Sequence, residues 1–339
     1  MKFINCSFLA AVGLLLSVVS CTETDIMAEP ETQSEIGFHA VLNNYKPSKA
    51  DPELRGVSLG EDNDYVVYMG ASADDSPKYF DPSATSYGGQ LFTYFTDGAR
   101  WFPASGNGTY TKQHIYWPFG GVTVDFLAYA LTPAAKSALA PTFNADTHAR
   151  DFKITDWDTF ANQFDVMYAY ANGCVPGTDG NIALSFKHAQ ALIAFTAKKS
   201  ATTTVDLTIN KITIKDLEYK GSLTVDNYRA KLNAYWTITG HGDKDLTAAE
   251  GIAYFPYTLN GTQTQITTNL LIPEQSAKQI VINYSMGGKT FDYELNIPRN
   301  KWKMGNKYTF NLVFSASEIT VTPTVDDWTD VIDNEQIGY

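Results

Sequence analysis

The segment NKYTFNLVF, residues 306–314, places an aromatic or aliphatic side chain at every second position from Tyr308 to Phe314. Alternation with a period of two predicts a β-strand that buries one face. The same alternation returns along the chain at Ile36, Phe38, Ala40 and Leu42; Val122, Val124 and Phe126; Ile182, Leu184 and Phe186; Val205, Leu207 and Ile209; Phe291, Tyr293, Leu295 and Ile297; and Ile319, Val321 and Val325. We therefore predict an all-β protein, with turns at the Gly-rich segments between strands.

The connections between these strands contain little helix. Helical patterns occur over 134–139 and 157–163, and both are short. Parallel neighbouring strands need long crossover connections, usually helices, at regular intervals. The sequence therefore predicts antiparallel β-sandwiches, and 339 residues are enough for two of them. The polar, Gly-rich stretch 171–181 divides the chain, so we expect an N-terminal domain over 35–181 and a C-terminal domain over 182–339.

The composition excludes several classes of partner. Hydrophobic residues make up 44% of the chain and aromatic residues 13%, which supports folded cores rather than a disordered chain. The net charge is −12. Nucleic-acid binding depends on neutralising phosphates with Lys and Arg, so this charge argues against nucleic acid as a partner. It argues equally against docking on an anionic membrane through a basic patch.

The first twenty residues are typical of an export signal, with Lys2 ahead of an apolar run over 8–19 that is too short to span a bilayer as a mature helix. The run ends in Ser17-Val-Val-Ser-Cys21, which resembles the lipobox of bacterial lipoproteins. This resemblance implies cleavage before Cys21 and a covalent lipid on its thiol and new amine, and we expect no other cofactor. The acidic segment 21–34 is then a tether to the membrane.

Cysteine usage agrees with export without disulfides. Cys6 is removed with the signal, Cys21 carries the lipid, and Cys174 is left without a cysteine to pair with. The fold must then be stabilised by its hydrophobic cores alone.

One segment matches the G-x-S-x-G pattern of serine hydrolases, and a second resembles it with Asn283 in place of the first glycine. Residues 56–60 place Ser58 in a loop context, although the pattern needs a strand before the serine and a helix after it. Residues 283–288 place Ser285 next to Gly287-Gly288, and the alternation over 289–295 predicts a β-hairpin instead of a helix. The five histidines show no metal-ligand spacing. We therefore expect neither catalysis nor a metal site.

Several segments in the same order resemble the fimbrillin superfamily of Bacteroidales, the FimA/Mfa-like pilins. They are Tyr116-Trp117-Pro118, VDFLAY at 124–129, DVMYA at 165–169, LSFKHA at 184–189, LNIP at 295–298, WKMGNKYTF at 302–310 and ITVTPTVDDW at 319–328. The resemblance implies two consecutive transthyretin-like β-sandwich domains and a subunit of an adhesive surface pilus. It also implies a location at the cell outer membrane, with other pilus subunits, the lipid of that membrane, and a receptor on host or bacterial surfaces as partners.

The same resemblance implies assembly by strand exchange. In the family an N-terminal strand is removed by cleavage after a basic residue in the loop that follows it, and an incoming subunit supplies a replacement. Here the first strand is 35–43, and its loop carries Lys46, Lys49 and Arg55. We expect cleavage between Arg55 and Gly56, with an unprocessed Arg55 as the alternative.

The C-terminal segment is the candidate donor strand. Ile319, Val321 and Val325 alternate, and Trp328 follows them. Pro323 excludes this segment from the centre of a continuous sheet, because proline cannot donate a ladder hydrogen bond. We therefore expect the part after Pro323, anchored by Trp328, to enter the groove of the next subunit.

Two other functions stay open at this point. Numerous aromatic residues could offer stacking platforms for sugars, which would make the protein a surface glycan-binding lipoprotein; core packing is the simpler use for them. A secreted serine hydrolase acting through Ser285 is disfavoured by the predicted hairpin.

Overall fold

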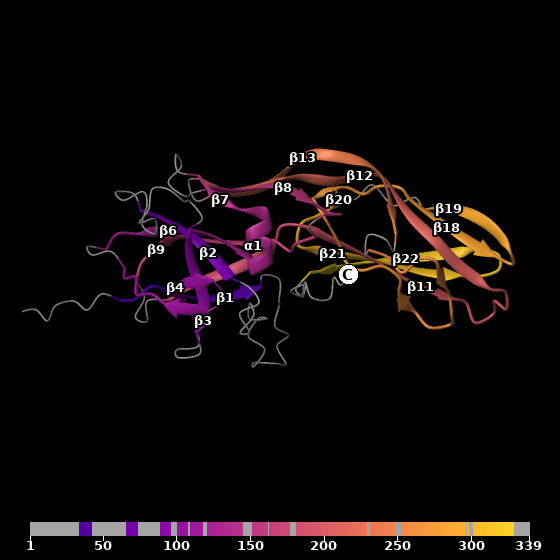
Figure 1. Ribbon diagram of the computed structural model, residues 1–339, viewed down its shortest axis with the longest axis horizontal. Helices are drawn as coiled ribbons and strands as arrows, with labels where there is room; N and C mark the ends of the chain where they lie inside the picture. The colour runs from indigo at the N-terminus through magenta and orange to yellow at the C-terminus, as the bar shows by residue number, and fades with distance from the viewer. Residues whose placement is uncertain are drawn as a thin grey trace, which may run out of the picture. The chain divides into compact units, whose positions relative to one another are not determined.

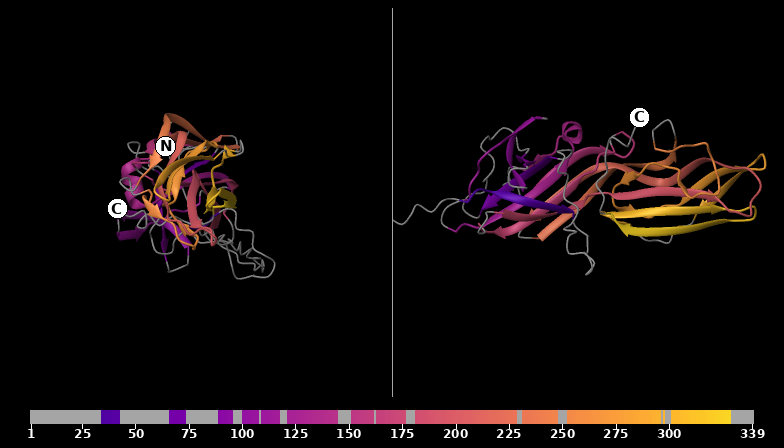
Figure 2. Two further views of the ribbon diagram at one scale, coloured as in Figure 1. Left: turned by 90° about the vertical axis from the view of Figure 1, so that its right-hand side faces the viewer. Right: turned by 90° about the horizontal axis from the view of Figure 1, so that it is seen from below.

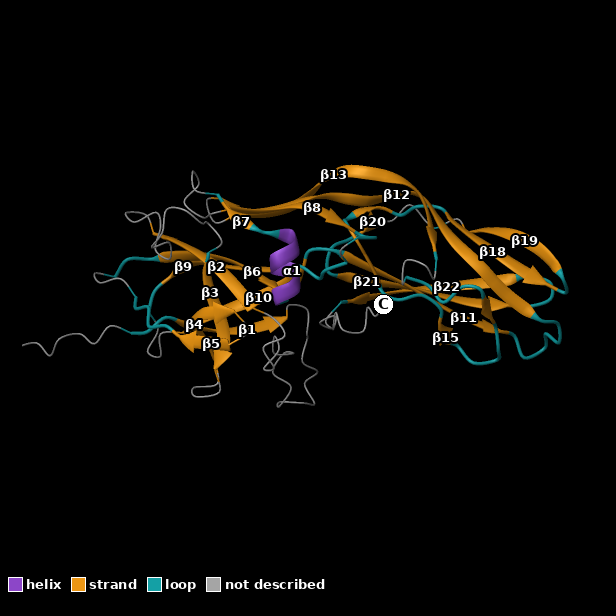
Figure 3. Ribbon diagram, viewed as in Figure 1, coloured by secondary structure: helices purple, strands orange, loops and turns teal. Residues whose placement is uncertain are grey.

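The computed structural model describes residues 34–42, 66–73, 89–95, 100–107, 109–117, 121–144, 151–161, 163–176, 181–228, 231–247, 252–295, 297 and 301–328. All of them belong to one compact unit, Gln33–Tyr339. Cys21, Lys46, Lys49, Arg55, Gly56 and Ser58 lie outside the described residues. Strands dominate the described part, which contains one helix, α1 (Pro133–Leu139) (Figure 3). The all-β prediction is confirmed.

The first sheet has eight strands and closes on itself. Its strands, in spatial order, are β1 (Gly37–Leu42), β10 (Asn181–His188), β9 (Met167–Cys174), β6 (Val124–Leu131), β2 (Val66–Ala73), β3 (Gln90–Phe95), β4 (Arg100–Asn107) and β5 (Thr109–Lys112). Strand β1 also pairs with β4, where Phe38 lies opposite Trp101. This second contact joins β1 to β4, so the strands from β1 to β4 in this order form a closed ring, and β5 is attached to β4. Strands β1, β2, β3, β4, β6 and β9 of this sheet are labelled in Figure 1.

Two further sheets are built mainly from the second half of the chain. The larger has β19 (Lys289–Leu295), β18 (Ile280–Met286), β12 (Leu207–Tyr228), β8 (Asp151–Asp158) and β7 (Thr142–Phe143), with β13 (Lys231–Leu246) and β14 (Tyr257–Thr258) paired to β12. The smaller has β15 (Thr264–Gln265), β11 (Ala191–Lys199), β21 (Asn306–Phe314) and β22 (Ile319–Asp327), with β16 (Leu270–Ile272) paired to β11. Strands β17 (Gln275–Ser276) and β20 (Lys301–Trp302) form a separate pair.

The core between these two sheets follows the predicted alternation. Tyr308, Phe310, Leu312 and Phe314 of β21 are all buried. They share one hydrophobic cluster with apolar residues of β11, β12 and β18, so the two sheets pack face to face (Figure 2). Burying one large apolar side chain contributes about 1.5–3 kcal/mol, and this stripe therefore supplies much of the stability of this part of the molecule.

The prediction of purely antiparallel sheets is wrong at two pairings. Strand β1 pairs parallel with β10, and β11 pairs parallel with β21. A period of two indicates which side chains share a face, but it carries no information about the direction of the neighbouring strand. Both pairs join strands far apart in sequence, and the intervening strands serve as the crossover connections that helices were expected to provide.

One of the two predicted helices is present. Thr132 caps α1 because its Oγ1 accepts a hydrogen bond from the Ala135 N–H at 3.1 Å, and Pro133 occupies the first turn. The helix predicted over 157–163 is absent, since Trp157 lies in β8 with its side chain buried. Its indole packs against Trp236 at a centroid distance of 5.2 Å, and this tertiary contact outweighs a weak local helix propensity.

Sheet membership changes between β10 and β11, while β12 runs through both parts. Ile182 lies in β10 and therefore in the first sheet, and the second half starts at Ala191 of β11. Strand β12 pairs with β18 over its first part and with β8 over its last part. A third hydrophobic cluster joins residues of β6, β8 and β12 to Trp328, and it fills the space where the sheets meet.

Prediction on the core of β21. Replacing Leu312 by Ala should lower the free energy of unfolding by about 2–5 kcal/mol, because the side chain is buried and the cavity cannot collapse fully. Val313, on the opposite and less buried face, is the matched control, and Val313→Ala should cost about 1 kcal/mol or less. Urea unfolding measures both. Equal losses would show that the face assignment of β21 is wrong.

Candidate assembly site

The candidate site begins with β1, which has a neighbouring strand on each edge. Its residues Gly37–Leu42 pair parallel with Asn181–Phe186 of β10, and Phe38 pairs antiparallel with Trp101 of β4. Just before the strand, the Ile36 N–H donates to the Ile115 carbonyl at 2.8 Å, and Ser34 accepts from the Trp117 N–H at 3.0 Å. The segment from Ser34 to Leu42 is therefore inserted into the sheet as an inner strand.

The side chains of this strand anchor it in the first core. Ile36 and Phe38 are both fully buried. The Phe38 ring stacks on Trp101 at a centroid distance of 5.7 Å and contacts Phe92 at 5.1 Å. These aromatic contacts add to the burial of the ring itself.

An ion-pair group fixes the entry of the strand. Glu35 lies 2.9 Å from His114 Nδ1 and 3.6 Å from Lys112 Nζ. Both partners follow or end β5, so the group ties the start of the strand to the neighbouring hairpin. Partly exposed pairs of this kind contribute about 0–1 kcal/mol, so they set position more than stability.

Removal of β1 would open the ring at one place. The edges of β10 and β4 would lose their partner, and Phe92, Trp101, Ile182 and Leu184 would lose the apolar cover that Ile36 and Phe38 give them. Unpaired backbone groups beside an apolar groove form a template for another strand. The geometry can therefore accept a replacement strand in the position of β1.

The candidate donor, β22, is at an edge. Its whole length pairs antiparallel with β21, from Phe314 opposite Ile319 to Asn306 opposite Asp327. The described residues give its other edge no neighbouring strand. Ile319 and Val321 pack partly on the core, whereas Val325 is 57% exposed. Pro323 lies within this edge strand, opposite Phe310, as proline in a sheet requires.

Trp328 follows β22 and is buried deeply. Its side chain is 1% exposed and stacks on the His188 ring at a centroid distance of 3.5 Å and an interplanar angle of 5°. Its backbone N–H donates to the Gly305 carbonyl at 2.9 Å. His188 Nδ1 lies 2.9 Å from Asp165 Oδ1, and both of these side chains are buried. The sequence analysis singled out Trp328 and quoted the segments that contain Asp165 and His188. It did not predict that these residues meet, because such a contact has no distinctive local pattern.

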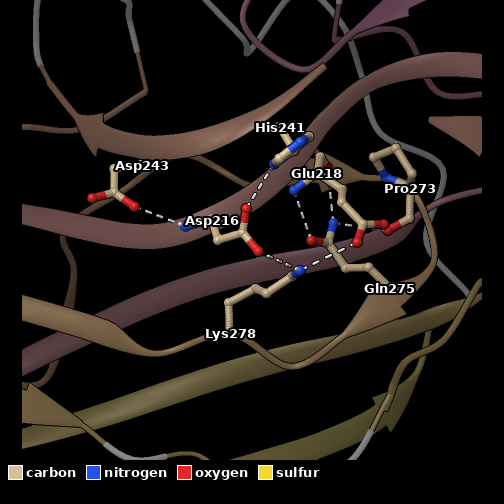
Figure 4. Close-up of polar contacts among 7 residues, drawn as sticks. All are labelled: Asp216, Glu218, His241, Asp243, Pro273, Gln275 and Lys278. Atoms are coloured by element: carbon tan, nitrogen blue, oxygen red, sulfur yellow. Dashed lines mark hydrogen bonds and ion pairs between the residues drawn. The ribbon is translucent and has the colours of Figure 1, made fainter. Parts of the chain in front are cut away.

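A polar cluster, which the sequence analysis missed, covers a bulge in β12. Lys278 Nζ lies 3.5 Å from Asp216 and 3.2 Å from Glu218, and His241 Nδ1 lies 2.7 Å from Asp216 (Figure 4). The hydrogen bond from His241 is the main cause that lowers the pKa of Asp216. Asp216 adopts a φ of +48°, where the register of β12 with β13 shifts.

Gln275 fixes the same bulge from the other side. Its side chain accepts from the Glu218 N–H and donates to the Glu218 and Pro273 carbonyls, at 2.9, 2.9 and 3.1 Å. Charges of both signs are paired throughout the cluster, and its hydrogen bonds hold the segment with β17 against β12. This arrangement is suited to fixing the bulge in place.

The remaining sequence candidates that fall within the described residues show no reactive arrangement. Ser285 lies in the β18–β19 hairpin, whose turn residues Gly287 and Gly288 have positive φ values of 56° and 79°, and its Oγ contacts Asn210 and Thr290. Burial and the nearby Asp125 raise the pKa of Cys174 to about 11, which keeps the thiol protonated at neutral pH.

Among the described residues, no three His, Cys, Asp or Glu side chains gather as a metal site would require. None of the helices described there is long and apolar enough to cross a membrane.

Aromatic residues are mostly used in packing. Five tryptophans, Trp101, Trp117, Trp157, Trp302 and Trp328, are among the largest fully buried side chains. The exposed aromatic residues of the described part lie on different segments; they are Tyr116, Tyr170, Tyr235, Tyr254 and Phe291. This distribution favours the core-packing interpretation over a platform for sugars.

These features define a class: an all-β protein in which β1 closes the first sheet and β22, the last strand that the structure describes, lies at a sheet edge. The Fimbrillin-like family model matches residues 60–328, and the chain belongs to this family. No curated protein matches the chain in sequence.

Solved structures share the fold. A fimbrial protein from Bacteroides vulgatus ATCC 8482 is 15% identical with a TM-score of 0.58, and the match covers 87% of this chain and 100% of that one. Candidate cell adhesion proteins from Bacteroides uniformis ATCC 8492 and Bacteroides ovatus ATCC 8483 are 17% and 16% identical, with TM-scores of 0.52 and 0.53. These two matches cover 87% and 89% of this chain and 99% and 100% of the other chains.

Prediction on the closing strand. Phe38→Ala should lower the free energy of unfolding by about 3–5 kcal/mol, since it leaves a cavity between Trp101 and Phe92. Phe291, which is 37% exposed in β19, provides a control with the same change of residue type, and Phe291→Ala should cost about 1 kcal/mol or less. Thermal and urea unfolding of the full precursor test the pair. A negligible loss for Phe38→Ala would mean that β1 contributes little to closing the sheet.

Proposed function

We propose that this protein is a structural subunit of a cell-surface pilus, exported as a lipoprotein and assembled by strand exchange, and that the pilus serves adhesion. The observation that carries the proposal is the position of β1, inserted between β10 and β4 with Phe38 in the core. Membership of the Fimbrillin-like family supports it, and so does the likeness to a fimbrial protein of Bacteroides vulgatus.

The two halves correspond, in this proposal, to two consecutive transthyretin-like β-sandwich domains. The first is closed where β1 meets β4, and the second consists of the face-to-face sheets around β12 and β21. The division at 181/182 expected from sequence then moves to the link between His188 and Ala191, because β10 pairs with β1 and β9. Strand β8 pairs across this division with β12, and β7 pairs with β8.

Processing would remove β1 after cleavage between Arg55 and Gly56. The groove then needs a strand that supplies backbone hydrogen bonds to β10 and β4 and apolar side chains in the places of Ile36 and Phe38. The C-terminal segment of a second subunit is the proposed donor, with Ile319, Val321, Val325 and Trp328 as its apolar residues. Each large side chain that becomes buried adds about 1.5–3 kcal/mol to the joint.

The partners follow from the same proposal. They are other pilus subunits, the outer-membrane lipid through Cys21 before processing, and a receptor on a host or bacterial surface. The net charge of −12 argues against nucleic acid.

Prediction on processing. Arg55→Ala should leave an intact precursor that does not polymerise, because its own β1 continues to fill the groove. Lys49→Ala in the same loop is the control and should polymerise normally. Immunoblots for the processed chain and electron microscopy of pili measure the two effects. Normal pili from the Arg55→Ala strain, with no cleavage at Lys46 or Lys49, would exclude Arg55 as the maturation site.

Prediction on the lipid. Cys21→Ala should abolish acylation and release the precursor from the outer membrane, because several acyl chains together make an anchor that is effectively permanent. Cys174→Ala is the control and should stay acylated. Metabolic labelling with a fatty acid, followed by membrane fractionation in high salt, tests both. Retention of Cys21→Ala in the washed membrane would contradict the lipoprotein assignment.

Prediction on the donor. Deleting residues 329–339 together with Trp328→Ala should give an exported monomer that keeps the first sheet and fails to join fibres. Circular dichroism and proteolysis establish folding, and electron microscopy measures assembly. Fibres of normal length would contradict the donor assignment, and so would complete unfolding of the variant, which would make the segment an ordinary core strand.

A further inference from the structure

The link between the first sheet and the second half of the molecule is very short. Only Ala189 and Gln190 stand between β10 and β11. The Ala189 N–H donates to the Val166 carbonyl at 2.8 Å, and the Ala189 carbonyl accepts from the Trp236 indole at 2.8 Å. The Gln190 carbonyl accepts from the Gly305 N–H at 2.8 Å. These hydrogen bonds fix the link in place. A shift of β10 is therefore transmitted through the link to Val166, Trp236 and Gly305.

His188 stands at the start of this link and supports Trp328. The two rings are parallel at 3.5 Å, and His188 is held in turn by Asp165 at 2.9 Å. Gly305 completes the contact: its carbonyl accepts from the Trp328 N–H, while its own N–H donates to Gln190. The end of β22 is thus attached to the end of β10 through one aromatic stack and one chain of backbone hydrogen bonds.

This attachment is less stable than its burial suggests. Asp165 Oδ2, His188 Nε2 and Trp328 Nε1 are buried, and the described residues give them no hydrogen-bond partner. A buried polar atom without a partner costs about 1–3 kcal/mol. Moving Trp328 away would let water reach these atoms, so hydration offsets part of the lost stacking. We call the stacking contact between Trp328 and His188 the latch, because it can open at this reduced cost.

The other end of the connection is β1. Its parallel ladder with β10 extends to Leu42 opposite Phe186, two residues before His188. Phe186 is fully buried in the same cluster as Phe38. Loss of β1 therefore removes the support of β10 on one side right up to the residues that carry the latch.

We propose that Asp165 and His188 are positioning residues that hold Trp328, and that through β10 they couple the β1 position to the end of β22. While β1 is in place, β10 is fixed and the latch stays closed. When β1 leaves, β10 loosens, and undocking of Trp328 becomes easier. The biological use of this coupling rests on the proposed strand exchange, where it would release the donor segment only after the groove has opened.

The test is backbone hydrogen exchange on the full precursor as a monomer. Phe38→Ala should raise exchange at the amides of 319–328 about tenfold, within the usual range for coupled sites. Met69→Ala is the control, because Met69 is buried in the same cluster but lies on β2, which does not pair with β10. Met69→Ala should change the exchange rates in β22 by less than about threefold, which is close to the usual deviation from additivity at independent sites.

Two further variants separate coupling from a merely structural role. Because coupling is reciprocal, Trp328→Ala should raise exchange at the amides of β1, whereas Trp328→Phe, which keeps a ring to stack on His188, should not. In a His188→Ala background, Phe38→Ala should no longer raise exchange in β22 beyond the level of His188→Ala alone. Where alanine variants fail to fold, Phe38→Leu and His188→Asn replace them.

Equal effects of Phe38→Ala and Met69→Ala on β22 would overturn the coupling, and so would independent, additive effects of Phe38→Ala and His188→Ala. These outcomes concern the isolated monomer. Failure to form pili in cells would count against the proposed function and leave the exchange data unaffected, so the two failures can be told apart.

Discussion

Strand β1 completes the first sheet by lying between β10 and β4. It pairs with β10 along its length and meets β4 at Phe38, so it closes a ring that would otherwise end in two edges. Closure removes the exposed edges that make open sheets prone to associate. The same insertion buries Ile36 and Phe38 in the core. The integrity of the first sheet therefore depends on a short segment near the beginning of the chain.

That dependence gives the proposed function its physical basis. A strand that is held by two neighbours and by aromatic packing leaves a specific groove when it is removed, with a defined direction and defined places for side chains. Within the described residues, β22 pairs with β21 alone and has an exposed Val325. An inner strand and an edge strand are therefore the two elements on which the proposed exchange depends.

The sequence predicted which side chains of a strand share a face, but it did not predict which distant segments lie next to each other. The buried face of β21 and the β18–β19 hairpin follow from local patterns, because alternation indicates a half-buried strand and a Gly-Gly turn between two strands indicates a hairpin. The length of β12 was not predicted, since Lys215 and Asp216 interrupt its alternation and lie at a bulge that Gln275 and Lys278 fix through tertiary contacts. The stacking of Trp328 on His188 was also not predicted. It joins residues from distant parts of the chain, and such a contact produces no periodic pattern in the sequence.

The two parallel ladders have a further consequence for how the chain folds. Strand β1 pairs with β10, and β11 pairs with β21, only after most of the intervening sequence has been synthesised and brought back. Closing such long loops costs entropy before the contacts repay it, and proteins dominated by non-local pairing fold in roughly milliseconds to seconds. The nascent chain therefore remains without its closing strand pairs for a comparatively long time. A chain that completes its sheets slowly exposes apolar strands and unpaired strand edges for longer, and it needs protection from aggregation during that interval.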